Sequence, residues 1–152
     1  MTTTRLDSTL QLTVALNLLR TATMMERRMS RQLVHGLALP ELLLLLYLRH
    51  SPDGRLRRVD LAERLGMSQS SVTRLLGPLE RRKIVRRVAD ERDARAVYAE
   101  LTGPGRIVVD DARASAELAA DDLFSTFDEA QLGQADTFLR QLVAGVPGSF
   151  RE

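Results

Sequence analysis

The chain has 152 residues, the size of one domain or of one subunit of a small oligomer. It has no cysteine, which excludes disulfide frameworks, thiolate zinc sites and thiol-based redox sensing, and its two histidines argue against an imidazole-rich metal site. We expect no metal and no cofactor. The first residues lack the apolar segment of a signal peptide, and the longest apolar run, Leu42 to Leu48, is too short to cross a bilayer. We therefore expect a soluble, cytoplasmic protein without a membrane partner.

The 22 basic and 20 acidic residues leave a formal net charge of +2, but the two signs are separated along the chain. Residues 49–95 hold 13 basic and seven acidic residues, whereas residues 96–152 hold four basic and ten acidic residues. Such a basic segment favours a polyanionic partner, although charge runs are also typical of solvated surfaces. Of the basic residues 21 are arginine, whose donor fork suits phosphate and guanine, and GC-rich coding is the alternative cause of this bias.

Apolar residues at steps of three and four predict a long helix over residues 8–35, with Gly36 as its end. Pro40 and Glu41 favour the first turn of a second helix. Its leucine run, residues 42–48, is apolar on every side, so this helix should be central and buried. The turn residues at 50–54 end it.

Two short helices follow, the first over residues 59–65 and closed by Gly66, the second from Gln69 to about Arg82 with Ser68 as its N-cap. Two short helices joined by a tight glycine-containing turn form a helix-turn-helix. On the second helix one face is apolar. The opposite face carries small polar and basic groups suited to base edges and phosphates, namely Gln69, Ser70, Thr73, Arg74 and Arg81.

Two β-like stretches come next, at residues 84–88 and 96–101, and a polar tip of residues 89–95 joins them. A basic hairpin directly after a helix-turn-helix is a wing, and Arg86 lies in its first strand. A long helix is then expected from Thr102-Gly103-Pro104 to about Thr126. An Asp128–Gln131 capping box opens a last helix, which Gly145 and Pro147 end.

The terminal helices carry more apolar surface than one small winged-helix core can bury, so we expect them to form a homodimer. The predicted fold is mainly α with a small β-wing. Residues 37–102 form a winged helix-turn-helix DNA-binding domain, and residues 1–36 and 103–152 form a helical dimerisation region. The sequence has no Gly-rich phosphate loop, metal-ligand spacing or Ser/His/Asp arrangement, so an enzyme is not expected.

Five stretches carry a recognisable pattern: Gly36-Leu37, residues 61–68, residues 72–80, residues 84–87, and residues 90–95 followed by Leu101-Thr102 and Gly105. Together they resemble the MarR family of winged helix-turn-helix transcriptional regulators. The resemblance implies a homodimer on double-stranded DNA, with a recognition helix in the major groove and the wing beside the minor groove. On matching positions, Ser68, Gln69, Ser70 and Ser71 through Arg74 would open the recognition helix.

The resemblance also makes Arg92 the wing-tip arginine that enters the minor groove, where a narrow groove concentrates negative potential. Asp90 and Arg95 would form an ion pair that structures the tip. Two positions depart from the family pattern. Lys83 stands where the family usually has glycine, which costs about 1 kcal/mol if the backbone there is left-handed. Gly77-Pro78 lies inside the recognition helix and favours a kink.

Regulators of this family commonly bind a small anionic or aromatic effector. The candidate pocket residues are Arg20, Arg27 and His35, for which a solvent-exposed surface position is the alternative. The predicted function is a ligand-responsive homodimeric repressor that binds a pseudo-palindromic operator. The alternative is a helical dimer whose winged helix mediates protein–protein contacts instead of DNA binding.

Overall fold

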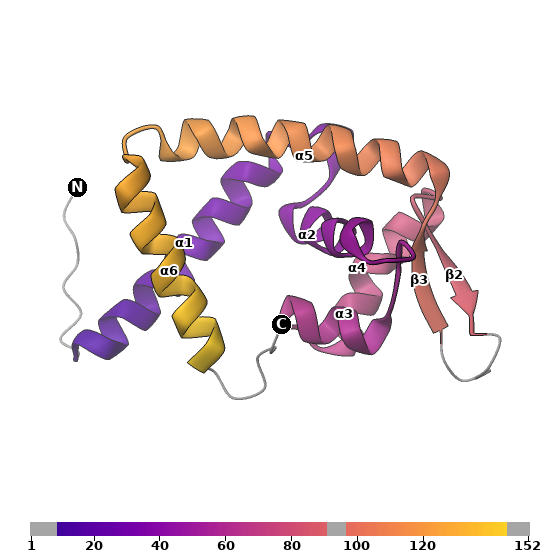
Figure 1. Ribbon diagram of the computed structural model, residues 1–152, viewed down its shortest axis with the longest axis horizontal. Helices are drawn as coiled ribbons and strands as arrows, with labels where there is room; N and C mark the ends of the chain where they lie inside the picture. The colour runs from indigo at the N-terminus through magenta and orange to yellow at the C-terminus, as the bar shows by residue number, and fades with distance from the viewer. Residues whose placement is uncertain (1–8, 91–96, 146–152) are drawn as a thin grey trace.

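The computed structural model describes residues 9–90 and 97–145. Its elements are α1 (Leu10–Ser30), a 3₁₀ turn η1 (Val34–Gly36), α2 (Leu39–His50), β1 (Arg55–Arg57), α3 (Arg58–Leu65), α4 (Gln69–Arg81), β2 (Val85–Ala89), β3 (Val97–Leu101), α5 (Gly103–Phe124) and α6 (Glu129–Gly145). Figure 1 shows α2, α3, α4 and the sheet near one end of the long helix α5, and α1 and α6 toward its other end. The expected mainly α fold with a small β-wing is confirmed.

Helix α2 is the centre of the core. Leu44, Leu45 and Leu48 have no exposed surface, and Leu42 is 2% exposed. The helix packs against α1, α3, α4, α5 and the sheet strands β1 and β3. The prediction of a central, buried helix is confirmed for these leucines, whereas Leu43 in the same run is 43% exposed. Side-chain carboxylate capping fixes where the helix begins, because Glu41 Oε2 accepts the backbone N–H of Ala38 at 2.8 Å.

The predicted helix over residues 8–35 was wrong beyond Ser30. The helix ends there because Leu33 and Leu37 are both buried in the core. A helix that continued along the axis of α1 would carry these two side chains away from α2. His35 and Gly36 have φ angles of 60° and 61°, outside the α-helical region. Ser30 stabilises the connection, since its Oγ accepts the backbone N–H of Leu39 at 2.8 Å.

The sheet has the strand order β1-β3-β2 and is antiparallel throughout. The wing hairpin β2–β3 is confirmed, with Val85 paired to Leu101 at its base and Ala89 to Val97 at the far end of its described part. Strand β1 was not predicted. Its three residues are too few for an alternation to be visible, and they become a strand by pairing with residues 98–100 of β3.

The N-terminus of α5 is fastened to the segment between α4 and β2. Thr102 Oγ1 caps α5 by accepting the backbone N–H of Gly105 at 2.9 Å, and it donates to the carbonyl oxygen of Lys83 at 2.7 Å. The Thr102 backbone N–H donates to the carbonyl oxygen of Ile84 at 3.1 Å. Gly105 lies directly against this carbonyl, where a Cβ atom would overlap the oxygen. The long helix therefore cannot shift without moving the end of α4.

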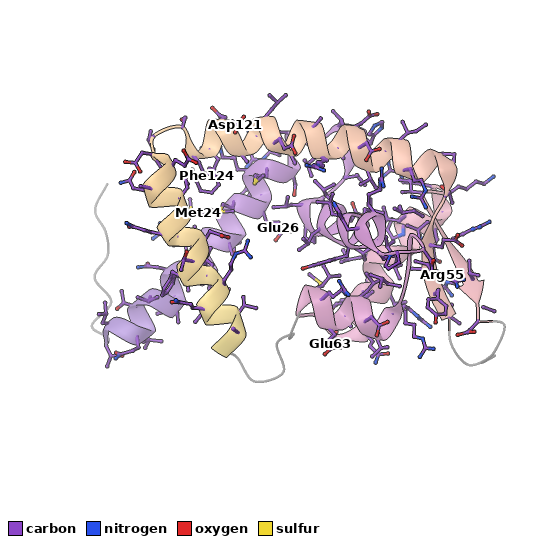
Figure 2. All side chains as sticks on the ribbon, in the orientation of Figure 1. Met24, Glu26, Arg55, Glu63, Asp121 and Phe124 are labelled. Atoms are coloured by element: carbon purple, nitrogen blue, oxygen red, sulfur yellow. The ribbon has the colours of Figure 1, made fainter. Side chains whose placement is uncertain are left out.

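The outer ends of α1 and α6 expose apolar side chains. In this single chain α6 buries none of its residues, although its predicted capping box is present: Asp128 Oδ1 accepts the Gln131 N–H at 2.8 Å, and Gln131 Oε1 accepts the Asp128 N–H at 3.0 Å. Figure 2 shows Met24 and Phe124 in this helical part of the molecule. The large exposed apolar residues of α1 and α6 include Leu10, Leu12, Leu19, Phe138, Leu139 and Leu142. Within residues 9–90 and 97–145, each helix is too short or too polar to span a membrane.

Substituting Gly105→Ala should lower the free energy of unfolding by about 1–3 kcal/mol, because the new methyl group overlaps the carbonyl of Ile84. Chemical denaturation measures this change. Gly103→Ala is the matched control in the same turn of α5, since a Cβ atom there meets nothing within 4 Å. Equal effects of the two substitutions would show that helix propensity, and not the close contact, controls stability at this turn.

Candidate nucleic-acid interface

The geometry of the turn between α3 and α4 comes from Gly66, which has a φ of 61°. Its N–H donates to the carbonyl of Glu63 at 3.0 Å, and the N–H of Met67 donates to that of Ala62 at 2.9 Å. This pair of bonds ends α3 in a Schellman motif, which a residue with a Cβ atom adopts at a cost. The buried residues Leu61, Ala62 and Val72 then pack the two helices into one core, confirming the helix-turn-helix.

Ser68 begins α4 as predicted. Its Oγ accepts the backbone N–H of Ser71 at 3.2 Å and contacts the hydroxyls of Ser70 and Ser71 at 2.9 and 3.0 Å. The side chain therefore satisfies an N–H that the first turn of a helix leaves unpaired. Because this hydroxyl is hydrogen-bonded within the helix, the role of Ser68 is to stabilise the first turn of α4.

The face of α4 opposite its buried residues is open to solvent. Gln69, Ser70, Arg74 and Arg81 are exposed there, whereas Thr73 is half-buried. Two side-chain bonds order this face: Arg74 Nη2 donates to Ser71 Oγ at 3.1 Å, and Arg58 Nη1 of α3 donates to Thr73 Oγ1 at 3.3 Å. The structure thus brings the predicted base-reading residues of α4 together on one surface.

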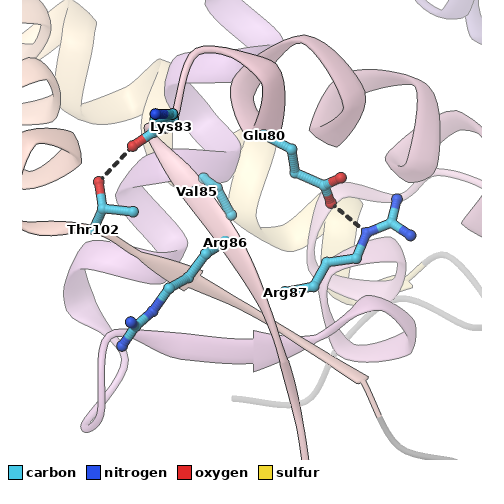
Figure 3. A pocket seen from close by; sticks show the side chains of 6 residues that line it. All are labelled: Glu80, Lys83, Val85, Arg86, Arg87 and Thr102. Carbon is cyan, nitrogen blue, oxygen red and sulfur yellow. Dashed lines mark hydrogen bonds and ion pairs between the residues drawn. The ribbon is translucent and has the colours of Figure 1, made fainter.

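Arg86 lies apart from this surface. Successive residues of a strand point to opposite faces, and in Figure 3 Arg86 and Arg87 extend to opposite sides of β2. Arg87 points toward α4, where its Nε donates to Glu80 Oε1 at 2.8 Å. Arg86 forms a two-pronged pair with Glu100 of β3, through Nε at 3.1 Å and Nη2 at 3.2 Å. In each case the hydrogen bond to the carboxylate is the main cause that raises the arginine pKa.

The root of the wing holds a contact network that the sequence did not predict. Asp90, the residue after β2, accepts a hydrogen bond from the Tyr98 hydroxyl at 3.2 Å, and Arg57 of β1 lies 3.5 Å from the same carboxylate oxygen. The Tyr98 hydroxyl itself accepts from Arg57 Nε at 3.1 Å. The remaining wing residues predicted to act on DNA or on the tip, Arg92 and Arg95, lie outside the described residues.

The three predicted pocket residues do not come together. Arg27 lines a cavity of about 630 Å³ with Met24, Arg28 and other residues of α1 and the following turn, together with Leu123 of α5. Arg20 is exposed on α1 outside this lining. His35 Nε2 lies 3.0 Å from Asp111 Oδ2, and its carbonyl accepts from Arg82 Nη2 at 2.6 Å.

No cluster of three or more histidine, cysteine or carboxylate residues in metal-binding reach occurs in the described part of the chain. The polar and basic groups exposed on α4 and the wing are a separate chemical feature. They offer hydroxyl and amide groups for base edges and guanidinium groups for phosphates and guanine. Such an arrangement can bind a nucleic acid duplex.

Comparison with known proteins gives the same indication. A model of the MarR family matches residues 35–96. Among solved structures, the chain is similar to Sco3205 of Streptomyces coelicolor, a MarR family transcriptional regulator in complex with DNA. The two are 25% identical with a TM-score of 0.81, over 97% of this chain and 94% of that one. Among curated proteins none matches.

Two further similar structures concern ligands. For BpsR of Bordetella bronchiseptica, whose DNA binding is regulated by 6-hydroxynicotinic acid, the identity is 22% and the TM-score 0.76, over 86% of this chain and 98% of that one. For PcaV of Streptomyces coelicolor, in complex with its natural ligand, the identity is 17% and the TM-score 0.75, over 95% and 99%. At these identities the likeness concerns the fold.

Lys83, the residue after the C-cap Arg82 of α4, has a left-handed backbone with a φ of 58°. Its N–H donates to the carbonyl of Glu80, and the Ile84 N–H to that of Leu79, each at 3.0 Å, which is again a Schellman motif.

Lys83→Gly should therefore raise the free energy of unfolding by about 1 kcal/mol in chemical denaturation. Lys83→Ala keeps the Cβ atom and the strain, so it should give no such gain. A gain of equal size with alanine would assign the effect to the lysine side chain.

Proposed function

We propose that this chain is a homodimeric transcriptional repressor of the MarR family, which binds a pseudo-palindromic DNA operator and responds to a small effector. The observation that carries the proposal is the exposed polar and basic face of α4, next to a wing, in a chain similar over 97% of its length to a regulator bound to DNA. Helix α4 enters the major groove, as recognition helices of helix-turn-helix proteins do.

Gln69, Ser70, Thr73 and Arg74 read base edges in this proposal, because they share the open face at the start of α4. Arg74 suits a two-pronged contact with guanine or a contact with phosphate. Ser68 and Ser71 shape the first turn, and Arg81 binds phosphate farther along. Arg86, whose side chain is 65% exposed, joins the phosphate contacts from the first strand of the wing.

The wing completes the DNA contact. We place Arg92 in the minor groove, where a narrow groove attracts arginine. Asp90 and Arg95 shape the tip, a role that fits the contacts of Asp90 with Tyr98 and Arg57 at the wing root. Residues 37–102 form the DNA-binding domain in this assignment.

Dimerisation uses residues 1–36 and 103–152. The support is the apolar surface of α1 and α6: Leu19 and Leu10 are 66% and 75% exposed, and Phe138 is 46% exposed. An apolar surface of this extent in two helices favours burial against another protein surface. A second copy fits best, because a two-fold dimer presents two recognition helices to a two-fold operator.

The effector site is the cavity lined by Arg27. It combines methionine and leucine side chains with the guanidinium groups of Arg27, Arg28 and Arg31, a combination that suits an aromatic acid. Because the cavity lies between α1 and α5, a ligand there can favour one arrangement of the helices over another.

Arg92→Ala should lower affinity for operator DNA and flatten the dependence of log affinity on log salt by about 0.9 for each phosphate that the variant no longer neutralises. Titration of DNA at several salt concentrations measures this slope. Arg20→Ala, an exposed arginine of α1, is the matched control and should leave the slope unchanged. If the wild-type protein itself shows no salt-dependent binding to DNA, the winged helix serves protein contacts instead.

Phe138→Glu should convert the dimer to a monomer in analytical ultracentrifugation, because it places a charge in the apolar surface of α6. Operator affinity should fall about 100-fold or more, since a monomer engages only one half-site. Gln134→Glu, also exposed on α6, changes the charge equally and should remain dimeric.

A wild-type footprint should show two half-sites about 34 Å apart or a multiple of this. A single asymmetric half-site would contradict the symmetric dimer.

Benzoate and its hydroxylated derivatives should raise the melting temperature of the protein, because a ligand at about 100 times its Kd adds about 2.7 kcal/mol to stability. Arg27→Ala should abolish the rise, and Arg20→Ala should retain it, since Arg20 lies outside the cavity lining. An equal rise in the wild type and in Arg27→Ala would place the ligand elsewhere.

A further inference from the structure

The structure places three side chains, from three strand positions, at the point where the wing tip leaves the sheet. Arg57 ends β1, Tyr98 stands directly opposite it on β3, and Asp90 follows the last residue of β2. Arg57 Nε donates to the Tyr98 hydroxyl at 3.1 Å, and that hydroxyl donates to Asp90 Oδ2 at 3.2 Å. The Arg57 Nη2 atom lies 3.5 Å from the same oxygen. We call this closed set of contacts the wing brace.

Two cation–π contacts to the Tyr98 ring add to the brace. The guanidinium carbon of Arg57 lies 5.4 Å from the centroid of the Tyr98 ring, and that of Arg55 lies 5.0 Å from it. Arg55 is labelled beside the sheet in Figure 2. Such cation–π contacts restrict the position of the ring. The hydrogen bond to the Tyr98 hydroxyl is the main cause that raises the pKa of Arg57, with the Asp90 carboxylate adding to it.

The brace continues to the recognition helix through one peptide bond. Arg58, the neighbour of Arg57, begins α3 and donates from Nη1 to Thr73 Oγ1 on α4 at 3.3 Å. Two consecutive arginines thus point to the two parts that contact DNA in the proposed function, one to the wing root and one to α4. The side chain of Asp90 is only 18% exposed, so most of its surface is covered by the protein.

We propose that Arg57, Tyr98 and Asp90 are positioning residues that fix the wing relative to the recognition helix, so that the major-groove and minor-groove contacts form in one register. This inference rests on the proposed function, because it assigns the brace a role in DNA binding. The Tyr98 hydroxyl acts through the placement of the wing tip and touches no DNA. The contribution of this hydroxyl to DNA affinity should therefore vanish when the wing tip makes no contact with DNA.

A double-mutant cycle tests this requirement. Tyr98→Phe keeps the ring and its stacking but removes the hydroxyl, and it should weaken operator binding about three- to tenfold, the value of one hydrogen bond. In an Arg92→Ala background the same change should cost less than about twofold. Tyr47→Phe, at the other tyrosine of the chain and on α2, is the matched control and should leave affinity unchanged. Melting temperatures of all variants exclude unfolding as the cause.

Mobility of the wing gives a second readout that needs no DNA. The chain has no cysteine, so a nitroxide on Ala89→Cys, exposed at the end of β2, labels one site. Its electron paramagnetic resonance spectrum should report a more mobile wing with Tyr98→Phe and no change with Tyr47→Phe. An unchanged spectrum, or equal costs in both arms of the cycle, overturns the inference alone. Failure of the wild type to bind any duplex overturns the proposed function and the inference with it.

Discussion

The close contact between Gly105 and the carbonyl of Ile84 is the constraint on which the rest of the molecule depends. Three structural units meet there: the end of α4, the start of β2 and the first turn of α5. Thr102 seals the junction, since its hydroxyl and its N–H each bond to the Lys83–Ile84 segment. Protein interiors are close-packed and transmit strain, so a junction without free space moves as one body. The orientation of α4 is therefore set by α5.

The same geometry changes the meaning of the positive charge in residues 49–95. Several of its arginines are paired with carboxylates: Arg57 with Asp90, Arg86 with Glu100 and Arg87 with Glu80. The arginine side chains of these pairs are 44–65% exposed, whereas the carboxylates are only 18–21% exposed. Leaving such a carboxylate without its partner is costly, so these pairs hold the arginines in defined positions on the surface.

Most of the fold could be predicted from local signals in the sequence. Ser68, Gly66 and the Asp128–Gln131 box act within one turn of chain, and the structure shows each acting as predicted. The end of α1 could not be found in this way, because it depends on where Leu33 and Leu37 are buried relative to α2. Lys83 was a position that the sequence did identify. It stands where the family pattern has glycine, which predicted a left-handed backbone, and its φ is 58°.

The site was harder to predict than the fold. The face of α4 follows from helical periodicity, but the side of a strand on which Arg86 or Arg87 points depends on a register set by β3. The contact of Arg57 with Tyr98 joins residues 41 positions apart through a strand that the sequence did not reveal. Pairings of this kind arise from tertiary structure alone.

Helix α5 also has a mechanical consequence. Its 22 residues make a rod about 33 Å long, clamped at one end to the base of α4 and carrying α1 and α6 toward the other. A rod of this length turns a tilt of about 5° at one end into a displacement of about 3 Å at the other. That displacement is close to the rise of about 3.4 Å between successive base pairs. A rotation of α5 by about 5° around its α1 and α6 end therefore displaces the clamped end, and with it the base of α4, by about this distance.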